Sequence, residues 1–252
     1  MSWQARLKDF RPEFFMRAFM LACALLAPVT HAATCTATSG PSRTSLLELY
    51  TSEGCSSCPP ADKWLSQLPP DSGVVPLAFH VDYWDRLGWR DPFGQAAFSQ
   101  RQRARNSGLG WVYTPQVMLD GADYRNWHRS RAPQMKPDPA SVGLVLTLTQ
   151  TPERIDVQVN SRLIGPASEE HAQLYLALYE NHLSSKVAAG ENARRTLRHE
   201  HVVRELVGPL DPNVRHSFRL QSGWKTADLG VAAFVLNPQG ETLQALVQPA
   251  CP

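Results

Sequence analysis

Cys55 and Cys58 form a CxxC pair, and their residue type and spacing allow redox chemistry. Two cysteines three positions apart can form a disulfide and release it by exchange with another thiol. The pair lies between a strand-like run and a helix-like run. Free N–H groups and the positive end of the dipole at a helix start stabilise a thiolate. We therefore interpret Cys55 as the solvent-facing, attacking thiol and Cys58 as the shielded, resolving thiol.

The residues around the pair act on the thiolate in opposite directions. The N–H groups of Ser56 and Ser57 are expected to face the Cys55 sulfur and stabilise its charge. Glu53 adds negative charge nearby, which opposes thiolate formation. The sequence therefore leaves open whether the pair oxidises or reduces its substrate.

The elements that must position these cysteines alternate between strand and helix from Ser45 to about Ala132. Apolar runs, helical spacing and turn residues mark their limits. Strands are expected at 46–50, 73–81 and 113–119, and helices at 59–68, 93–107 and 125–131. This order predicts a small α/β unit.

The order of strand, CxxC and helix resembles the thioredoxin fold. Thioredoxin-like proteins carry a cis-proline that faces the dithiol, and the resemblance implies this role for Pro115 and a substrate-pairing backbone for Thr114. The strings Gly-Cys-Ser-Ser-Cys-Pro-Pro, His-Val-Asp-Tyr-Trp-Asp and Tyr-Thr-Pro-Gln also resemble a family of secreted bacterial thioredoxin-like proteins of unassigned function, the domain of unknown function 1223 family. The resemblance implies the fold and leaves the reaction open.

A further acid and a cluster after the second strand are candidates for a substrate groove. Glu48 lies seven residues before Cys55, whereas thioredoxins carry a buried acid six residues before, so it is a buried acid, a surface carboxylate or a strand-end cap. Ligands bind at strand ends in open α/β sheets. The groove candidates at such an end are His80, Asp82, Tyr83 and Trp84, with an aromatic loop packed on the sheet as the alternative.

Metal binding has a weaker basis in the sequence. A copper site built from Cys55, Cys58 and His80 is an alternative, although copper-delivery proteins of this fold usually space their cysteines as CxxxC. A structural zinc site would need more ligands, and no second CxxC exists. We therefore predict no metal and no other cofactor. The histidines at 128, 171, 182, 199, 201 and 216 are interpreted as surface residues.

The period of the apolar residues changes to two after Pro133, Pro137 and Pro139. Seven short strands are expected after this linker, which is typical of an antiparallel sandwich. The predicted fold is therefore an α/β thioredoxin-like domain at residues 43–135, followed by an all-β immunoglobulin-like sandwich at residues 140–252.

Residues 1–32 read as a secretory signal peptide. Four basic residues precede a short apolar run, and small residues follow it, so we place cleavage after Ala32; an uncleaved anchor is the alternative. Cleavage would leave 21 of the 25 basic and 21 of the 23 acidic residues, a net charge of zero. This balance does not support a nucleic-acid or anionic-membrane footprint, so we predict no nucleic-acid partner. We predict a periplasmic or secreted protein with no membrane span in the mature chain.

Cys35 and Cys251 are the remaining cysteines of the mature chain. In an oxidising compartment they are expected to form a structural disulfide, with two free thiols as the alternative. The sequence as a whole predicts thiol–disulfide exchange with a protein substrate and an unidentified redox partner, which would make the chain an oxidoreductase. A non-catalytic thioredoxin-fold binding module and a copper(I) chaperone remain alternatives. The substrate and the oligomeric state are not predicted.

Overall fold

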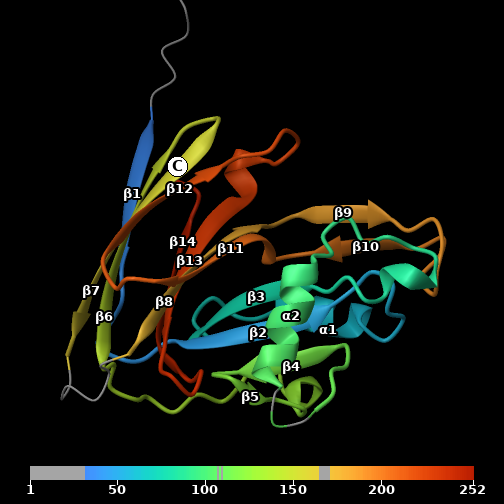
Figure 1. The fold of residues 1–252 in the computed structure, drawn as a ribbon, viewed down its shortest axis with the longest axis horizontal. Helices are drawn as coiled ribbons and strands as arrows, with labels where there is room; N and C mark the ends of the chain where they lie inside the picture. Colours follow the sequence, from blue (N-terminus) through green and yellow to red (C-terminus); the bar gives the residue numbers. More distant parts are fainter. Residues whose placement is uncertain (1–31, 107, 109, 165–170) are drawn as a thin grey trace, which may run out of the picture. The chain divides into compact units, whose positions relative to one another are not determined.

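The computed structural model describes residues 32–106, 108, 110–164 and 171–252, which consist mainly of β-strands (Figure 1). Within these residues there are two α-helices, α1 (Pro59–Ser66) and α2 (Ala96–Arg105). The strands of the first half are β1 (Ala33–Thr38), β2 (Ser45–Thr51), β3 (Val74–His80), β4 (Gln116–Leu119) and β5 (Ala122–Asp123). The strands of the second half are β6 (Val142–Gln150), β7 (Arg154–Leu163), β8 (Gln173–Glu180), β9 (Leu183–Lys186), β10 (Thr196–His199), β11 (Val202–Leu210), β12 (Val214–Arg219), β13 (Leu229–Leu236) and β14 (Thr242–Pro249). Three single-turn 3₁₀ helices lie at Asp85–Leu87, Trp127–Arg129 and Thr226–Asp228.

One sheet of eight strands contains elements from both halves of the chain, in the order β14-β13-β8-β11-β3-β2-β4-β5. β3 lies parallel to β2 and also pairs in parallel with β11 through Val202 and Ala78. The other pairings in this sheet are antiparallel. A second sheet has the order β1-β6-β7-β12, and β9 and β10 form a two-stranded ribbon.

The two helices lie on opposite faces of the eight-stranded sheet. Successive side chains of a strand point to opposite faces. Leu46 and Tyr50 of β2 therefore pack in one cluster with Phe98 of α2, whereas Leu47 and Leu49 pack in another with Leu65 of α1. Figure 1 shows α2 crossing in front of β2 and β3. The cysteine pair precedes α1 and thus belongs to the α1 face.

The four-stranded sheet covers the other part of the large sheet. Inward residues of β6 and β7, such as Leu146 and Ile155, pack against Leu176 of β8 and Ala233 of β13. The intervening residues of β8 and β13 point to the opposite face, and they include Ala177 and Phe234. They pack in the cluster that contains Phe98 of α2, here called the α2 cluster. The two faces of β8 and β13 are thus both buried.

The predicted fold class, a thioredoxin-like α/β domain followed by an immunoglobulin-like sandwich, is wrong. The structure is mostly β-sheet, and β11 joins the strands of both parts because it pairs with β8 on one edge and with β3 on the other. The α2 cluster consequently combines Phe79 and Met118 with Tyr179 and Phe234. Residues 46–118 and 177–245 share this core, so two independently packed units do not describe the protein.

Some predicted elements differ locally from those observed. The helix expected at 125–131 is a single 3₁₀ turn, Trp127–Arg129. In the second half, β10 and β11 are separated at His201, whose φ of 57° lies in the left-handed region. β1 was not predicted. The signal peptide proposed for residues 1–32 lies, except for Ala32, outside the described residues.

The predicted disulfide between Cys35 and Cys251 is present, with Cα atoms 5.5 Å apart. It joins β1 of the four-stranded sheet to the residues that follow β14 of the eight-stranded sheet. Over the part of the chain that the structure describes, no helix is long and apolar enough to cross a membrane.

Candidate functional site

Cys55 and Cys58 form a disulfide at the start of α1, with Cα atoms 5.4 Å apart. Cys58 is the N-cap residue, and prolines occupy the first helical positions, where no intrahelical N–H partner is lost. The Cys58 carbonyl accepts the N–H groups of Ala61 and Asp62, which begins the helix. The hydroxyl of Ser57 lies 3.3 Å from the sulfur of Cys55.

The disulfide is covered, contrary to the expectation that Cys55 faces solvent: both cysteines are 0% exposed. Residues 187–195 between β9 and β10, here called the covering loop, contact the backbone around it. The buried amide of Asn192 donates to the carbonyls of Glu53 and Cys55, both at 2.9 Å. Glu191 accepts the N–H of Ser56 at 3.0 Å. This N–H therefore pairs with a carboxylate rather than with the sulfur.

Thr114 and Pro115 are joined by a cis peptide bond. The Thr114 hydroxyl accepts a hydrogen bond of 2.8 Å from the indole N–H of Trp84. Trp84 in turn packs on Gly54, where an added Cβ would lie 2.9 Å from the Trp84 Cβ. Three sequence-distant segments therefore meet beside Cys55, and Gly54 is needed for this close approach.

Glu48 is a buried acid, but it lies on the α2 face of the sheet. Its two carboxylate oxygens pair with Arg101 at 2.8 Å and Arg105 at 2.9 Å. Burial alone would raise the pKa of Glu48, but the charges and hydrogen bonds of the two arginines outweigh it and hold that pKa below its ordinary value. This carboxylate therefore holds α2 on the sheet.

The residues predicted to line a groove contact different parts of the structure. His80 is buried at the end of β3, on the side of α1 and opposite to Glu48. Asp82 accepts from Ser99 of α2, and Tyr83 donates to Gln102 of the same helix. Trp84 contacts Thr114, as described above. The structure thus does not bring Glu48, His80, Asp82, Tyr83 and Trp84 together in one place.

Beneath the covering loop, two histidines and two carboxylates form a buried hydrogen-bonded network. Asp91 accepts from Nδ1 of His80 and from the backbone N–H of Glu53, both at 2.8 Å. The Glu53 carboxylate pairs with Nε2 of His199 at 3.1 Å and accepts the indole N–H of Trp89 at 2.7 Å. The two imidazole rings lie edge to face with centroids 4.9 Å apart.

His80 and Asp91 stabilise each other's charged forms. Burial alone would lower the pKa of His80, but the charge of Asp91 and the hydrogen bond to it outweigh burial and raise that pKa. Burial alone would raise the pKa of Asp91, yet His80 and the N–H groups of Glu53 and Phe93 lower it to about 2. Asp91 is therefore ionised in the folded protein at neutral pH.

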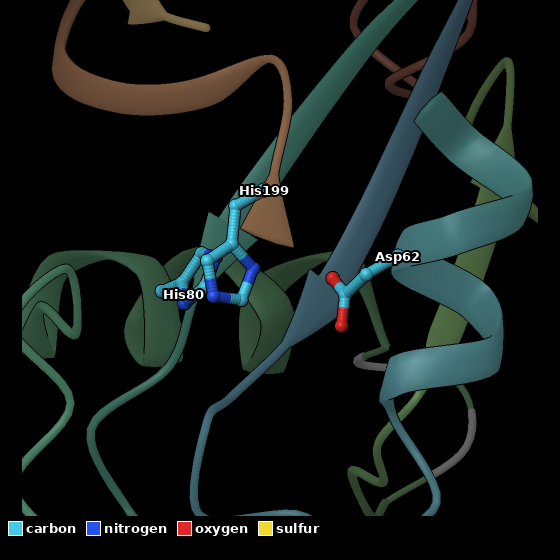
Figure 2. Close-up of side chains that lie close together, drawn as sticks. All are labelled: Asp62, His80 and His199. Carbon is cyan, nitrogen blue, oxygen red and sulfur yellow. The ribbon is translucent and has the colours of Figure 1, made fainter. Parts of the chain in front are cut away.

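Asp62 of α1 approaches the two histidines from the other side (Figure 2). One carboxylate oxygen accepts the hydroxyl of Thr51 at 3.1 Å, and burial raises the pKa of Asp62. Ligand-type atoms of Asp62, His80 and His199 all lie within 4.8 Å of one another. This cluster contains His80 but neither cysteine, so it differs from the copper site considered from the sequence.

Sequence reasoning missed several residues of this site. His199 was interpreted as a surface residue, but it is 3% exposed and follows His80 by more than a hundred positions. Asn192 and Asp91 likewise carry no local signal. Asp62 could have been found, because it lies one helical turn after Cys58 and therefore on the same helix face.

Comparison with known proteins gives a family and a fold. Residues 46–236 match the family described as a protein of unknown function (DUF1223). No protein of curated function matches the chain. A protein from Agrobacterium tumefaciens has a similar structure, with 24% identity, a TM-score of 0.55, and coverage of 84% of this chain and 96% of that one. HBP35 of Porphyromonas gingivalis is also similar, with 14% identity, a TM-score of 0.56, and coverage of 84% and 76% respectively. At these identities the likeness concerns the fold alone.

Proposed function

This chain belongs to the DUF1223 family of proteins of unknown function, and we propose that it exchanges thiols and disulfides with a protein substrate through Cys55 and Cys58. The observation that carries the proposal is the position of the pair at the N-terminus of α1, with the Ser57 hydroxyl 3.3 Å from the Cys55 sulfur. After reduction, this hydroxyl can donate to a Cys55 thiolate, and the helix dipole favours the same charge.

The exchange is a two-step transfer of two electrons. A substrate thiolate attacks the Cys55 sulfur, a substrate–Cys55 disulfide forms, and the Cys55–Cys58 bond breaks with Cys58 leaving as a thiolate. A second substrate thiolate then attacks the substrate sulfur of this mixed disulfide, so that the substrate becomes a disulfide and Cys55 leaves as a thiolate. The reverse sequence reduces a substrate disulfide. A dithiol or disulfide partner restores the starting state.

Access to the sulfurs requires the covering loop to move. Both cysteines are buried, and Asn192 and Glu191 hold the loop on residues 53–56. The same burial favours a second candidate, a binding module whose Cys55–Cys58 disulfide is static. The two candidates differ in the potential at which this disulfide is reduced, because structural disulfides resist the glutathione pool.

A redox titration of the full chain distinguishes these candidates. Protein equilibrated in graded glutathione and dithiothreitol buffers is alkylated, and the state of each cysteine is measured by peptide mass spectrometry. For exchange we expect Cys55–Cys58 to be reduced at potentials above about −300 mV, while Cys35–Cys251 in the same molecule stays oxidised. Simultaneous reduction of both disulfides below that potential would support the static module.

A trapping experiment tests the assignment of Cys55. The variant Cys58→Ala keeps Cys55 free, and its matched control Cys55→Ala keeps Cys58 free. With a disulfide-bridged model peptide, Cys58→Ala is expected to accumulate the mixed disulfide at Cys55, because no resolving thiol remains. Greater accumulation in Cys55→Ala, with the adduct mapped to Cys58, would reverse the two roles.

A further inference from the structure

The cluster of Asp62, His80 and His199 has the composition and geometry of a metal-binding site. The three residues come from α1, from the end of β3 and from the end of β10, and their side chains converge on one point (Figure 2). We propose that they bind a divalent transition-metal ion, with Zn²⁺ as the expected ion. This inference does not depend on the proposed thiol–disulfide exchange.

Two nitrogens of the cluster are available for coordination. Nε2 of His80 and Nδ1 of His199 are buried and have no hydrogen-bond partner among the residues that the structure describes. Buried polar atoms in native proteins almost always have a partner, because an atom left without one destabilises the folded state. A metal ion between these nitrogens and Asp62 would satisfy both of them.

The other nitrogen of each ring is held as in known histidine ligands. Nδ1 of His80 faces Asp91, and Nε2 of His199 faces Glu53. An ionised carboxylate can only accept a hydrogen bond, so the nitrogen that faces it carries the hydrogen. When the ring is neutral, its lone pair is then on the nitrogen without a partner, and a metal ion would bind there in place of the second proton. Metal-binding histidines usually have such a carboxylate or carbonyl behind them, which fixes the tautomer and the ring orientation.

The charge of the site also favours a cation. Asp62, Glu53 and Asp91 place three carboxyl groups around two histidines, in a region where all five side chains are buried. Buried carboxylates are stable only when they are paired or bound to a metal. When the imidazoles are neutral, a divalent ion would supply the positive charge that these carboxyl groups lack.

The residue types indicate the class of ion. Two imidazoles and one carboxylate suit zinc and other late transition metals, whereas magnesium and calcium prefer oxygen ligands alone. Ligand atoms around tetrahedral zinc lie about 3.3 Å apart, so binding would draw the three side chains slightly closer than the present limit of 4.8 Å. Three protein ligands leave a fourth position for water or a substrate atom.

A cavity connects this site with the surface. It has a volume of about 480 Å³, and its lining includes Asp62 and His199 together with Lys63 and Arg198. The Phe93 ring packs edge to face with both imidazole rings, with centroids 5.3 and 5.6 Å away. The cavity therefore gives an ion a route to Asp62 and His199.

Titration of the full chain with Co²⁺, followed by displacement with Zn²⁺, tests the proposal. Both disulfides are kept oxidised so that thiolates cannot bind the ion. We expect wild type to bind a single Co²⁺ with the intense visible absorption of a four- or five-coordinate site, and Zn²⁺ to abolish the absorption and raise the thermal unfolding midpoint. A wild-type protein without saturable Co²⁺ or Zn²⁺ binding would overturn the proposal.

Variants locate the ion. His199→Ala and the nearly isosteric Asp62→Asn are expected to lose the Co²⁺ spectrum, whereas His128→Ala, which changes an exposed histidine, should keep it. Asp91→Asn, which alters a positioning residue, is expected to weaken binding about 10- to 100-fold. Wild-type affinity in both His199→Ala and Asp62→Asn would show that the ion binds elsewhere and overturn the proposal. The variant Cys55→Ser/Cys58→Ser cannot exchange disulfides and should still bind Co²⁺, so the two proposals fail independently.

Discussion

Glu48 is the residue whose contacts have the clearest energetic consequence. It is fully buried and its charge is balanced by Arg101 and Arg105 of α2. The Arg101 guanidinium also stacks over the rings of Phe79 and Phe234, which belong to the two halves of the chain. One ion-pair network thus fixes α2 at the place where the first half meets the second.

Replacing Glu48 with Gln should lower the free energy of unfolding by about 3–5 kcal/mol, because it leaves two largely buried guanidinium groups without their carboxylate. Urea unfolding at neutral pH measures this change. Glu153→Gln, which alters an exposed carboxylate, is the matched control and should unfold like wild type. Equal urea midpoints for all three proteins would show that the network contributes nothing net to stability.

The same carboxylate predicts a pH dependence. The pKa of Glu48 is lowered in the folded state relative to its ordinary value of 4.5, so its contribution to stability is present above about pH 4.5 and is lost as the pH falls through the folded pKa. The difference in unfolding free energy between wild type and Glu48→Gln should therefore be larger at about pH 7 than at about pH 3.5. A difference that stays constant across this range would contradict the assignment.

The sequence located the residues near the CxxC pair, but it did not predict which residues contact them. Local spacing located Cys55 and Cys58 and the segment of Thr114. The partners of this region, among them Asn192 and His199, come from a segment more than a hundred residues away. A single sequence contains no signal for contacts at this separation, since side-chain type alone does not distinguish a buried histidine from an exposed one.

At the scale of elements, the covering loop controls the disulfide. Asn192 is buried, and it alone supplies hydrogen bonds from the loop side chains to the carbonyls of Glu53 and Cys55 within the described chain. Its own carbonyl accepts from Arg195, which tightens the loop. A small number of polar contacts, together with the buried side chain of Val187, therefore hold the loop closed.

Replacing Asn192 with Ala should make the disulfide easier to reach. The change leaves the Glu53 carbonyl without its donor and the Cys55 carbonyl with the N–H of Cys58 alone. At a cost of about 1–3 kcal/mol to the closed loop, this corresponds to about 5- to 150-fold more frequent opening. The rate of Cys55–Cys58 reduction by dithiothreitol should rise accordingly. Asn160→Ala, on an exposed position of β7, is the control. An unchanged rate would mean that the reductant reaches the sulfurs by another route.

The individual elements of the first half were predicted well because their patterns are local. β2, α1 and β3 begin and end within two residues of the expected limits. The 3₁₀ turn at Trp127–Arg129 was overestimated as a helix because three residues of helical spacing cannot be distinguished from a short helix. β9 was missed because Leu183 is its one apolar residue, so the segment shows no apolar periodicity.

At the scale of the whole molecule, the prediction of two separate domains of known fold failed at strand pairing. Period-two alternation predicts which side chains of β8 and β11 face a core, but it does not say which strand lies at each edge. β11 pairs with both β8 and β3, so that the apolar residues of both halves form one cluster. Seven strands were expected in the second half, whereas nine lie in its described residues, and their arrangement was not predicted.

The disulfide between Cys35 and Cys251 should be the larger of the two contributions to stability. It joins residues 216 positions apart, and the chain-entropy relation gives about 5 kcal/mol for such a loop, against about 2 kcal/mol for the short loop of Cys55–Cys58. Urea unfolding of Cys35→Ser/Cys251→Ser should show the greater loss, with Cys55→Ser/Cys58→Ser as the matched comparison. The opposite ranking would contradict this account.

The strand order of the eight-stranded sheet makes the timing of protein synthesis important. β3 ends at His80, but its neighbour β11 begins only at Val202. At a translation rate of about 5–20 residues per second, β3 waits roughly 10 seconds for this neighbour. During that interval the growing chain presents an apolar strand with an unpaired edge, which is the kind of surface that holding chaperones protect. The late strands must therefore be synthesised before the free edge of β3 can be paired and the cluster on the α2 face completed.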